Sequence, residues 1–404
     1  FPDAKFMVQV PLATTNISET VAWAKAAVDL IGLEQIHSLQ IGNEPNAYSE
    51  HFRGEGGMYL GPPEYQGTLT NETYEGNYTE YASAIREAIT LPDRFFTAFD
   101  IGEQVNTPWQ SAWLFDVETV FDLGIDRDHI IKEVSHHYYQ NVAGGAADLE
   151  AGLMDMAKTH TQLDYLRGHI EYLKANHPNI PYILNEIGNS LDATHSYEYQ
   201  ARLGSALWAV DFYLYSLSIG IARFNYQQLM HSGFDMWLPI ASNGLPAQVF
   251  ANYYAQPFLG DFVGDSGRTR VAKLDVGNSE DTPNLAAYAA FEEGLARRIA
   301  IANLDYWNRT SSDTSRPVAT VRLRIPWEAK WVKVTHLNSP DGAGAAADTI
   351  TYAGSQWTYE SMGREQTGVR NDTEWIRVRD RVAEVEVTSS EAVIVYMSED
   401  RRND

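Results

Sequence analysis

The chain has 404 residues and a formal net charge of -24, with 54 acidic against 30 basic residues, and it contains no cysteine. This length fits two domains, and the negative charge disfavours binding to a polyanion such as nucleic acid. Without cysteine the chain forms no disulfide and no thiolate metal site. The longest apolar stretch, residues 203–224, is interrupted by Asp211, Ser216, Ser218 and Gly220, which favours a buried helix and strand over a membrane span.

Strands and helices are expected to alternate over the first part of the chain, which is typical of a parallel α/β architecture. Apolar runs predict strands at residues 5–12, 36–41, 94–101, 130–139, 181–190 and 221–229. Helical spacing of apolar residues predicts helices at residues 20–33, 78–91, 109–123, 157–175, 198–217 and 248–259. Residues 48–78 are expected to form a long functional loop, although a tolerated insertion is an equally good interpretation.

The pattern changes at about residue 263, where short strands separated by turn signals begin. In one of them Val321, Leu323 and Ile325 alternate with arginines, which is typical of a half-buried antiparallel strand. We therefore expect a catalytic α/β domain over residues 1–262 and a β-sandwich over residues 263–404.

Two glutamates follow buried strands of the first region. Glu44 lies in Asn43-Glu44-Pro45, where the proline prevents further ladder pairing, and Glu186 follows Asn185 after another apolar run. A solvated loop is the ordinary place for one such glutamate. Two in similar contexts predict the paired carboxylates of glycoside hydrolysis, with Asn43 placed to donate to a sugar 2-hydroxyl.

With Val134-Ser-His-His-Tyr-Tyr139 and Asn185-Glu-Ile-Gly188 added to Asn43-Glu44-Pro45, the chain resembles glycoside hydrolase family 79, the β-glucuronidases and heparanase. The resemblance covers nearly the whole chain. It implies a retaining (β/α)8 TIM-type barrel and a carboxyl-terminal β-sandwich, with Glu44 as acid/base on barrel strand four and Glu186 as nucleophile on strand seven.

The same resemblance implies several substrate contacts. Tyr138 would hold the nucleophile, His136 would line the sugar site, and Gln228, His231 and Trp237 would contact the substrate. Aromatic packing at a strand end is the alternative for the His-Tyr run. Many relatives carry a tyrosine after strand eight that helps to hold the uronate carboxylate, whereas residues 231–237 contain none. This departure leaves uronate specificity open.

Six strands are fewer than the eight that such a barrel needs. Counting the first as barrel strand three leaves the first two unaccounted for. Heparanase is active as two chains cut from one precursor, so the resemblance implies an amino-terminal segment or light chain that completes the barrel.

We therefore expect a retaining β-glycosidase, most simply a β-glucuronidase acting on glycans, without metal or organic cofactor and without nucleic-acid or membrane partners. In the resting enzyme the charge of Glu186 is expected to raise the pKa of Glu44, which must start protonated. The alternatives are an exo-glycosidase of the same clan acting on a neutral sugar, and an inactive carbohydrate-binding protein.

Five Asn-X-Ser/Thr sequons suggest a secreted, N-glycosylated protein. They begin at Asn16, Asn71, Asn77, Asn308 and Asn371.

Overall fold

The computed structural model describes residues 4–66, 69–102, 116–141, 148–191, 197–198, 201–228, 235–242, 244–277, 283–312, 315–325 and 329–397. The chain divides into two compact units that interleave along the sequence. The first comprises Phe1–Tyr138, Tyr165–Ile187 and Gly220–Tyr226, and the second Tyr139–Asp164, Gly188–Ile219 and Gln227–Asp404. The expected boundary between residues 262 and 263 stays a prediction.

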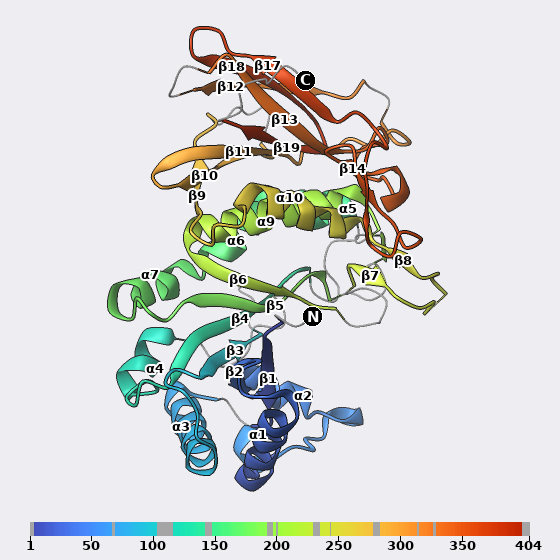
Figure 1. The fold of residues 1–404 in the computed structure, drawn as a ribbon. Helices are drawn as coiled ribbons and strands as arrows, with labels where there is room; N and C mark the ends of the chain where they lie inside the picture. Colours follow the sequence, from blue (N-terminus) through green and yellow to red (C-terminus); the bar gives the residue numbers. More distant parts are fainter. Residues whose placement is uncertain are drawn as a thin grey trace. The chain divides into compact units, whose positions relative to one another are not determined.

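The six predicted strands form one sheet in chain order (Figure 1). Its strands are β1 (Phe6–Val10), β2 (Ile36–Ile41), β3 (Phe96–Ile101), β4 (Ile131–Asn141), β5 (Tyr182–Ser190) and β6 (Ile221–Tyr226). The pairs β1–β2, β2–β3, β3–β4 and β5–β6 are parallel. All the carboxyl ends of such a sheet meet at one edge, which is where barrel-type enzymes build their sites.

Helices of the first unit cover one face of this sheet (Figure 1). They are α1 (Ile17–Ile31), α3 (Asn71–Ala88), α4 (Val117–Leu123) and, further along the chain, α7 (Arg167–Asn176). Each of the first three begins with a side-chain cap, in which Asn16, Thr70 or Asp116 accepts a hydrogen bond from a backbone N–H of the first turn. These caps fix where the three helices start.

Three predicted helices and the predicted loop differ from the structure. The short helix η1 (Pro45–Ala47) precedes the predicted loop. The loop at 48–78 itself holds α2 (Tyr48–His51), η2 (Glu55–Gly57), η3 (Pro63–Tyr65) and the start of α3. Thr70 caps α3, so that helix begins within the segment that was predicted to be irregular. The predicted helix at 157–175 is two helices, α6 (Met156–Asp164) and α7. The predicted helix at 248–259 instead starts as β8 (Gln248–Val249) and η4 (Ala251–Tyr254), and part of the one at 109–123 lies outside the described residues.

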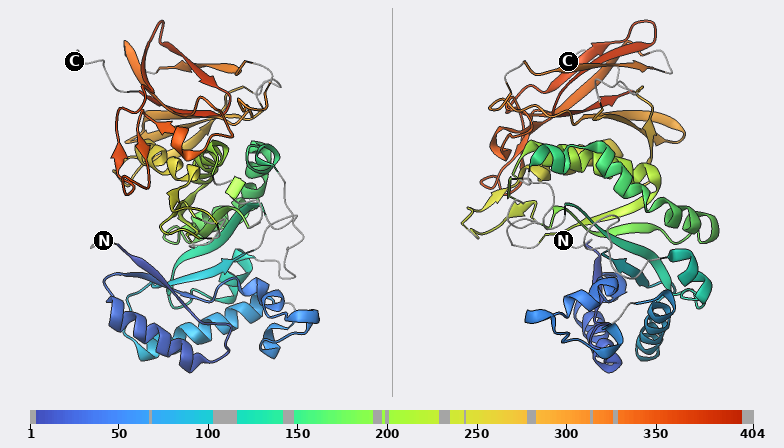
Figure 2. Two further views of the ribbon diagram at one scale, coloured as in Figure 1. Left: turned by 90° about the vertical axis from the view of Figure 1, so that its right-hand side faces the viewer. Right: turned by 180° about the vertical axis from the view of Figure 1, so that it is seen from behind.

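The second unit contains helices and a β domain (Figure 2). Its helices are α5 (Leu149–Leu153), α6, α9 (Leu203–Ile219) and α10 (Ala255–Val263), and a small ribbon joins β7 (Trp237–Leu238) to β8. Fourteen consecutive residues of α9, from Leu203 to Ser216, are buried. This confirms that the long apolar stretch contains a core helix, and within the described ranges no helix has the length and apolar composition needed to cross a membrane.

The β domain consists of a seven-stranded sheet and a strand pair facing a common apolar core. The sheet has the order β14-β13-β19-β11-β10-β9, with β17 beside β13, and the pair is β12–β18. The predicted alternation in β12 is confirmed, because Leu323 enters the core while Arg322 and Arg324 are exposed. The strands are β9 (Arg270–Leu274), β10 (Leu285–Glu292), β11 (Leu295–Asn303), β12 (Val318–Arg324), β13 (Trp331–Asn338), β14 (Thr351–Tyr352), β17 (Thr373–Arg377), β18 (Val382–Thr388) and β19 (Glu391–Tyr396), with η5 (Ala347–Thr349) and the ribbon β15 (Gln356–Trp357)–β16 (Glu365–Gln366) between them.

Candidate active site

Glu44 is placed by the abrupt end of β2. Gly42 follows the strand with φ 84°, a conformation that glycine adopts without strain, and a Cβ there would lie 2.8 Å from Tyr48 Oη. Glu44 itself has left-handed backbone angles (φ 45°, ψ 54°), and Pro45 begins the short helix η1. A left-handed non-glycine residue persists only where its surroundings hold it, and here the Glu44 N–H donates to the Asp100 carbonyl at 2.9 Å.

Glu186 lies inside β5, at an irregularity of the ladder. Leu184 pairs with Phe224 and Ile187 with Tyr226, so three steps along β5 match two along β6. Neighbouring residues of a regular strand point to opposite faces, and an extra residue relaxes that rule. Asn185 and Glu186 accordingly both line the same cavity.

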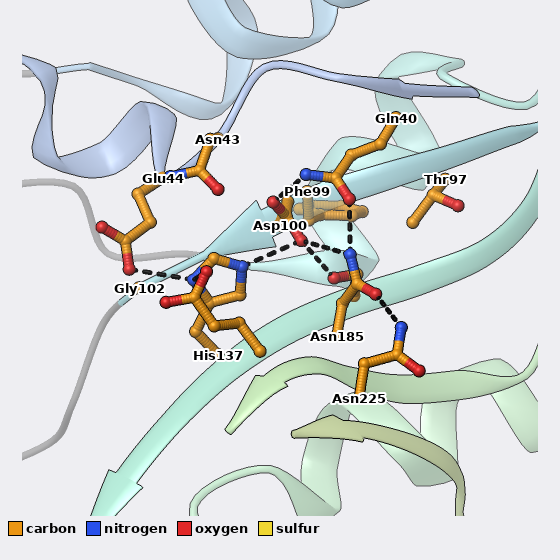
Figure 3. A network of polar contacts seen from close by, with 12 residues as sticks. Gln40, Asn43, Glu44, Thr97, Phe99, Asp100, Gly102, His137, Asn185 and Asn225 are labelled. Atoms are coloured by element: carbon orange, nitrogen blue, oxygen red, sulfur yellow. Dashed lines mark hydrogen bonds and ion pairs between the residues drawn. The ribbon is translucent and has the colours of Figure 1, made fainter. Parts of the chain in front are cut away.

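The two glutamates meet around one histidine, and Figure 3 shows Glu44 beside that residue, His137. A carboxylate oxygen of Glu44 and one of Glu186 lie within 4.8 Å of each other. His137 Nδ1 is 2.9 Å from Glu44 Oε1 and 3.8 Å from Glu186 Oε2, and its Nε2 is 3.0 Å from Asp100 Oδ1. The structure therefore brings together two carboxylates that are 142 positions apart in sequence (186 − 44).

The expected rise in the pKa of Glu44 is not what the structure favours. Burial does raise that pKa, but the hydrogen bond and the charge of His137, together with the charge of His51, outweigh burial and lower it. For His137 burial lowers the pKa, whereas Asp100 and Glu44 raise it well above its usual value. The site therefore favours a protonated histidine beside an ionised Glu44.

Glu44, His137 and Glu186 each offer one atom that could hold a metal ion. Ligation needs a ring nitrogen with a free lone pair. Both nitrogens of His137 face carboxylate oxygens, which favours a proton on each of them. The described part of the site thus fits proton chemistry better than metal binding.

A cavity of about 470 Å³ opens beside the pair. Its wall includes Asn43, as expected, together with Asn185 and Glu186. Two cationic side chains, Lys5 and Arg223, also line it. Arg223 Nη2 is 2.7 Å from the buried carboxylate of Glu133, which ties β6 to β4.

His136 and Tyr138 were expected at the sugar, but the cavity wall on β4 is His137. Both are buried, at 2% and 4% exposure. Glu133, Ser135 and His137 make the inward contacts of β4, and strand alternation puts His136 and Tyr138 on the other face. The roles implied for these two residues stay predictions.

The remaining expected contacts lie after β6. The side-chain amide of Gln228 donates to the Trp237 carbonyl at 2.8 Å, and its oxygen accepts from the Met236 N–H at 2.8 Å, so this residue folds the segment back on itself. Trp237 is 44% exposed. His231 lies outside the described residues. Their contacts with a substrate stay predictions.

Sequence reasoning missed Asp100, Gly102 and the function of His137. Two signals were available in the sequence. One is the short Phe-Asp-Ile-Gly run at the end of a predicted strand, and the other is the alternation of side chains along His-His-Tyr-Tyr, which puts the two histidines on opposite faces. Asp100 accepts hydrogen bonds from Gln40, Ser135 and Asn185, and Asn225 donates to Asn185 (Figure 3). This network connects five strands, β2 to β6, under the carboxylate pair.

Gly102 makes room for the acid/base candidate. A Cβ at this position would lie 2.2 Å from Glu44 Oε1. We expect Gly102→Ala to push the carboxyl group away and to lower kcat/KM by about 10²-fold, as small misplacements of catalytic groups do. Gly76→Ala on α3 is the control, because nothing lies within 4 Å of its added Cβ. Steady-state kinetics of both variants checks this, and full activity of Gly102→Ala would mean that Glu44 works from another position.

Parallel strands that bring two carboxylates to one edge, followed by a β domain, are the arrangement typical of barrel-type glycoside hydrolases. Residues 287–394 match the family model described as the glycosyl hydrolase family 79 C-terminal beta domain. The chain belongs to glycoside hydrolase family 79.

Two curated relatives are described as beta-glucuronidases. The one from Aspergillus niger is 30% identical over 296 residues, which are 69% of this chain and 53% of that protein. The one from Neurospora crassa is 28% identical over 222 residues, 50% of this chain and 40% of that protein. The chain thus spans about half the length of these relatives, or less.

Two solved structures share the fold. The complex of a 4-O-alpha-L-rhamnosyl-beta-D-glucuronidase from Fusarium oxysporum with Rha-GlcA has a TM-score of 0.76 at 18% identity, covering 96% of this chain and 76% of that one. A GH51 arabinofuranosidase from Xanthomonas axonopodis pv. citri has a TM-score of 0.62 at 13% identity, covering 98% and 76%. At these identities the likeness concerns the fold alone.

Proposed function

We propose that this protein is a retaining β-glycoside hydrolase that removes glucuronic acid from glycans. The observation that carries the proposal is the close approach of Glu44 and Glu186, within 4.8 Å between carboxylate oxygens. Retaining enzymes hold their two carboxyl groups about 5–5.5 Å apart, whereas inverting enzymes leave about 6.5–9.5 Å for a water molecule. The measured approach supports direct attack by Glu186.

In this mechanism Glu44 protonates the leaving oxygen while Glu186 attacks the anomeric carbon. The glycosyl-enzyme is then hydrolysed by water, with Glu44 acting as base. Asn43, beside Glu44 in the cavity wall, is placed to donate to the 2-hydroxyl of the sugar.

A glucuronide is favoured over a neutral sugar by two observations. The curated relatives are beta-glucuronidases, and Lys5 and Arg223 in the cavity wall offer cationic hydrogen-bond donors to a uronate carboxylate. The formal charge of -24 disfavours a densely sulfated chain as substrate, because long-range repulsion opposes its approach. A single terminal uronate carries only one charge.

A panel of chromogenic glycosides tests the proposal. We expect the β-D-glucuronide to be cleaved and the β-glucoside, β-xyloside and α-L-arabinofuranoside to be poor substrates, with NMR showing the β-anomer as first product. Preference for one of the neutral sugars would favour the neutral-sugar alternative. Binding without turnover of any member would indicate the inactive carbohydrate-binding alternative.

We also propose that two further strands complete a (β/α)8 barrel, in the same polypeptide or a bound one. Within the described residues, β1 and β6 each have one strand neighbour, so each leaves an unpaired edge. Phe6 on β1 is 46% exposed, and on α1 Trp23 and Leu30 are 57% and 85% exposed. A helix covering α1 and a strand beside β1 would bury these side chains.

Intact-mass analysis of the active protein, native and denatured, tests this completion. We expect polypeptide beyond the 45.3 kDa of this sequence. Leu30→Lys should weaken the association of that further polypeptide, or its packing against α1. A fully active single species of that mass plus glycans would contradict the proposal.

Secretion with N-glycosylation also stays a proposal. Among the sequons, Asn16 and Asn371 are exposed. Deglycosylation of protein from a eukaryotic secretory host should lower its mass, and Asn371→Gln should remove one glycan. An unglycosylated secreted product would contradict the prediction.

A further inference from the structure

A buried charged chain leads from Asp100 to the acid/base glutamate. Asp100 and His137 are 1% and 2% exposed. The two ring nitrogens of His137 face Asp100 Oδ1 at 3.0 Å and Glu44 Oε1 at 2.9 Å. Ionised carboxylates only accept hydrogen bonds, so a ring facing two of them is favoured in its doubly protonated form, the direction in which Asp100 and Glu44 raise the pKa of His137.

The backbone turns Asp100 into this position at a local cost. Phe99 and Asp100 have φ of 75° and 54° inside β3, and the ladder to β4 slips between Phe99 and Ile101. A side chain other than glycine is strained in this region, and such strain concentrates at functional sites. The Phe99 N–H donates to Tyr74 Oη, which holds the turn from the α3 side.

Both oxygens of the Asp100 carboxylate accept hydrogen bonds. Ser135 Oγ donates to it at 2.6 Å and Asn185 Nδ2 at 3.2 Å, both to Oδ1, and Gln40 donates to Oδ2. Several donors hold a buried carboxylate in one orientation. Asp100 therefore holds the ring of His137 in one orientation.

The two-carboxylate mechanism leaves this arrangement unexplained. It needs a proton on Glu44, but the adjacent imidazolium favours the ionised form of Glu44. The groups that face His137 and Glu44 are Asp100 on β3, Glu186 on β5 and His51 on α2, whose Nε2 is 3.5 Å from Glu44 Oε2. Among these groups, His137 is buried and lies within hydrogen-bond distance of Glu44, so a proton on its Nδ1 points at the Glu44 carboxylate.

We propose, building on the proposed function, that Asp100 is a positioning residue that keeps His137 as the store of the proton that Glu44 delivers. In the first step the Nδ1–H bond of His137 breaks and an O–H bond forms on Glu44 Oε1. That proton passes to the glycosidic oxygen as the C–O bond breaks, its electron pair staying on the oxygen. Glu186 forms the new bond to carbon, and the attacking water later returns a proton to Glu44 and the ring.

Asp100→Asn tests the proposal through the pH profile. Without the anion the ring loses its proton at lower pH, so the basic limb of kcat/KM should move down by about one pH unit or more. With a dinitrophenyl leaving group, which needs little protonation, this shift should vanish. Glu80→Gln on α3 is the control, because it removes an exposed carboxylate that takes no part in these contacts; its basic limb should stay at that of the parent enzyme. A purely structural role would lower activity at every pH alike.

Ring-nitrogen NMR of labelled histidine gives a readout that does not depend on turnover. At neutral pH His137, assigned by its loss in His137→Gln, should show two protonated nitrogens in the parent protein and one in Asp100→Asn. A neutral ring in the parent protein, or an unmoved basic limb in a folded Asp100→Asn, overturns the proposal. If no glycoside is cleaved, the proposed function fails while the NMR still decides the charge of the ring.

Discussion

Glu186→Gln is expected to abolish turnover of every glycoside, by on the order of 10⁴- to 10⁶-fold in kcat, as the loss of an enzyme nucleophile does. The amide has no charge with which to attack the anomeric carbon, and a good leaving group does not replace that attack. The fold should survive, because Glu186 is one-quarter exposed and lies at the cavity wall. Steady-state kinetics on activated and unactivated glucuronides measures the loss.

Covalent trapping identifies the same residue independently. A fluorinated glucuronide with a good leaving group should form a long-lived ester, and peptide mass mapping should place it on Glu186. The control is Glu171→Gln on the exposed face of α7, which should keep full activity. An ester on another residue, or turnover by Glu186→Gln near that of the control, would overturn the assignment.

Glu44→Gln is expected to have an effect that depends on the leaving group. Phenyl glucuronide needs protonation as its bond breaks, so its kcat/KM should fall by about 10²–10⁴-fold. A dinitrophenyl glucuronide needs little protonation, so its first step should be nearly unaffected. Hydrolysis of the glycosyl-enzyme then becomes rate-limiting, because no base activates the water.

Azide separates the two carboxylate roles. It attacks without general base help, so it should restore turnover of the activated substrate by Glu44→Gln and yield the β-glucuronosyl azide. Glu186→Gln should give no β-glucuronosyl azide, since it forms no glycosyl-enzyme that azide could attack. Equal losses on both substrates, with no azide effect, would show that Glu44 is not the acid/base. The exposed Glu80→Gln on α3 serves as control.

Local pattern was enough to predict the six parallel strands and the change to β structure. The apolar runs are short, and glycine, proline or capping residues bound them, so few other structures fit. Glu44 and Glu186 could be expected at one edge because parallel strands all end there. None of these inferences requires knowing which way a given side chain points.

The sequence does not show which residues of β4 face inward. In Ser-His-His-Tyr-Tyr either histidine can face inward, and a shift of one residue exchanges the two faces of a strand. The ladder places His137 beside Glu44 and turns His136 away. The direction of the pKa shift of Glu44 follows from that placement, which is why the expectation from charge pairing alone was wrong.

The sequence alone therefore determined where the six strands lie and that two carboxylates meet at one edge, since both depend on local pattern and on the shared direction of parallel strands. Tertiary structure decided the surroundings of those carboxylates. Bulges at Phe99–Asp100 and Asn185–Glu186 turn polar side chains inward, and Gly102 leaves space for Glu44. These features depend on ladder register and on contacts between residues far apart in the chain, and no single segment encodes either.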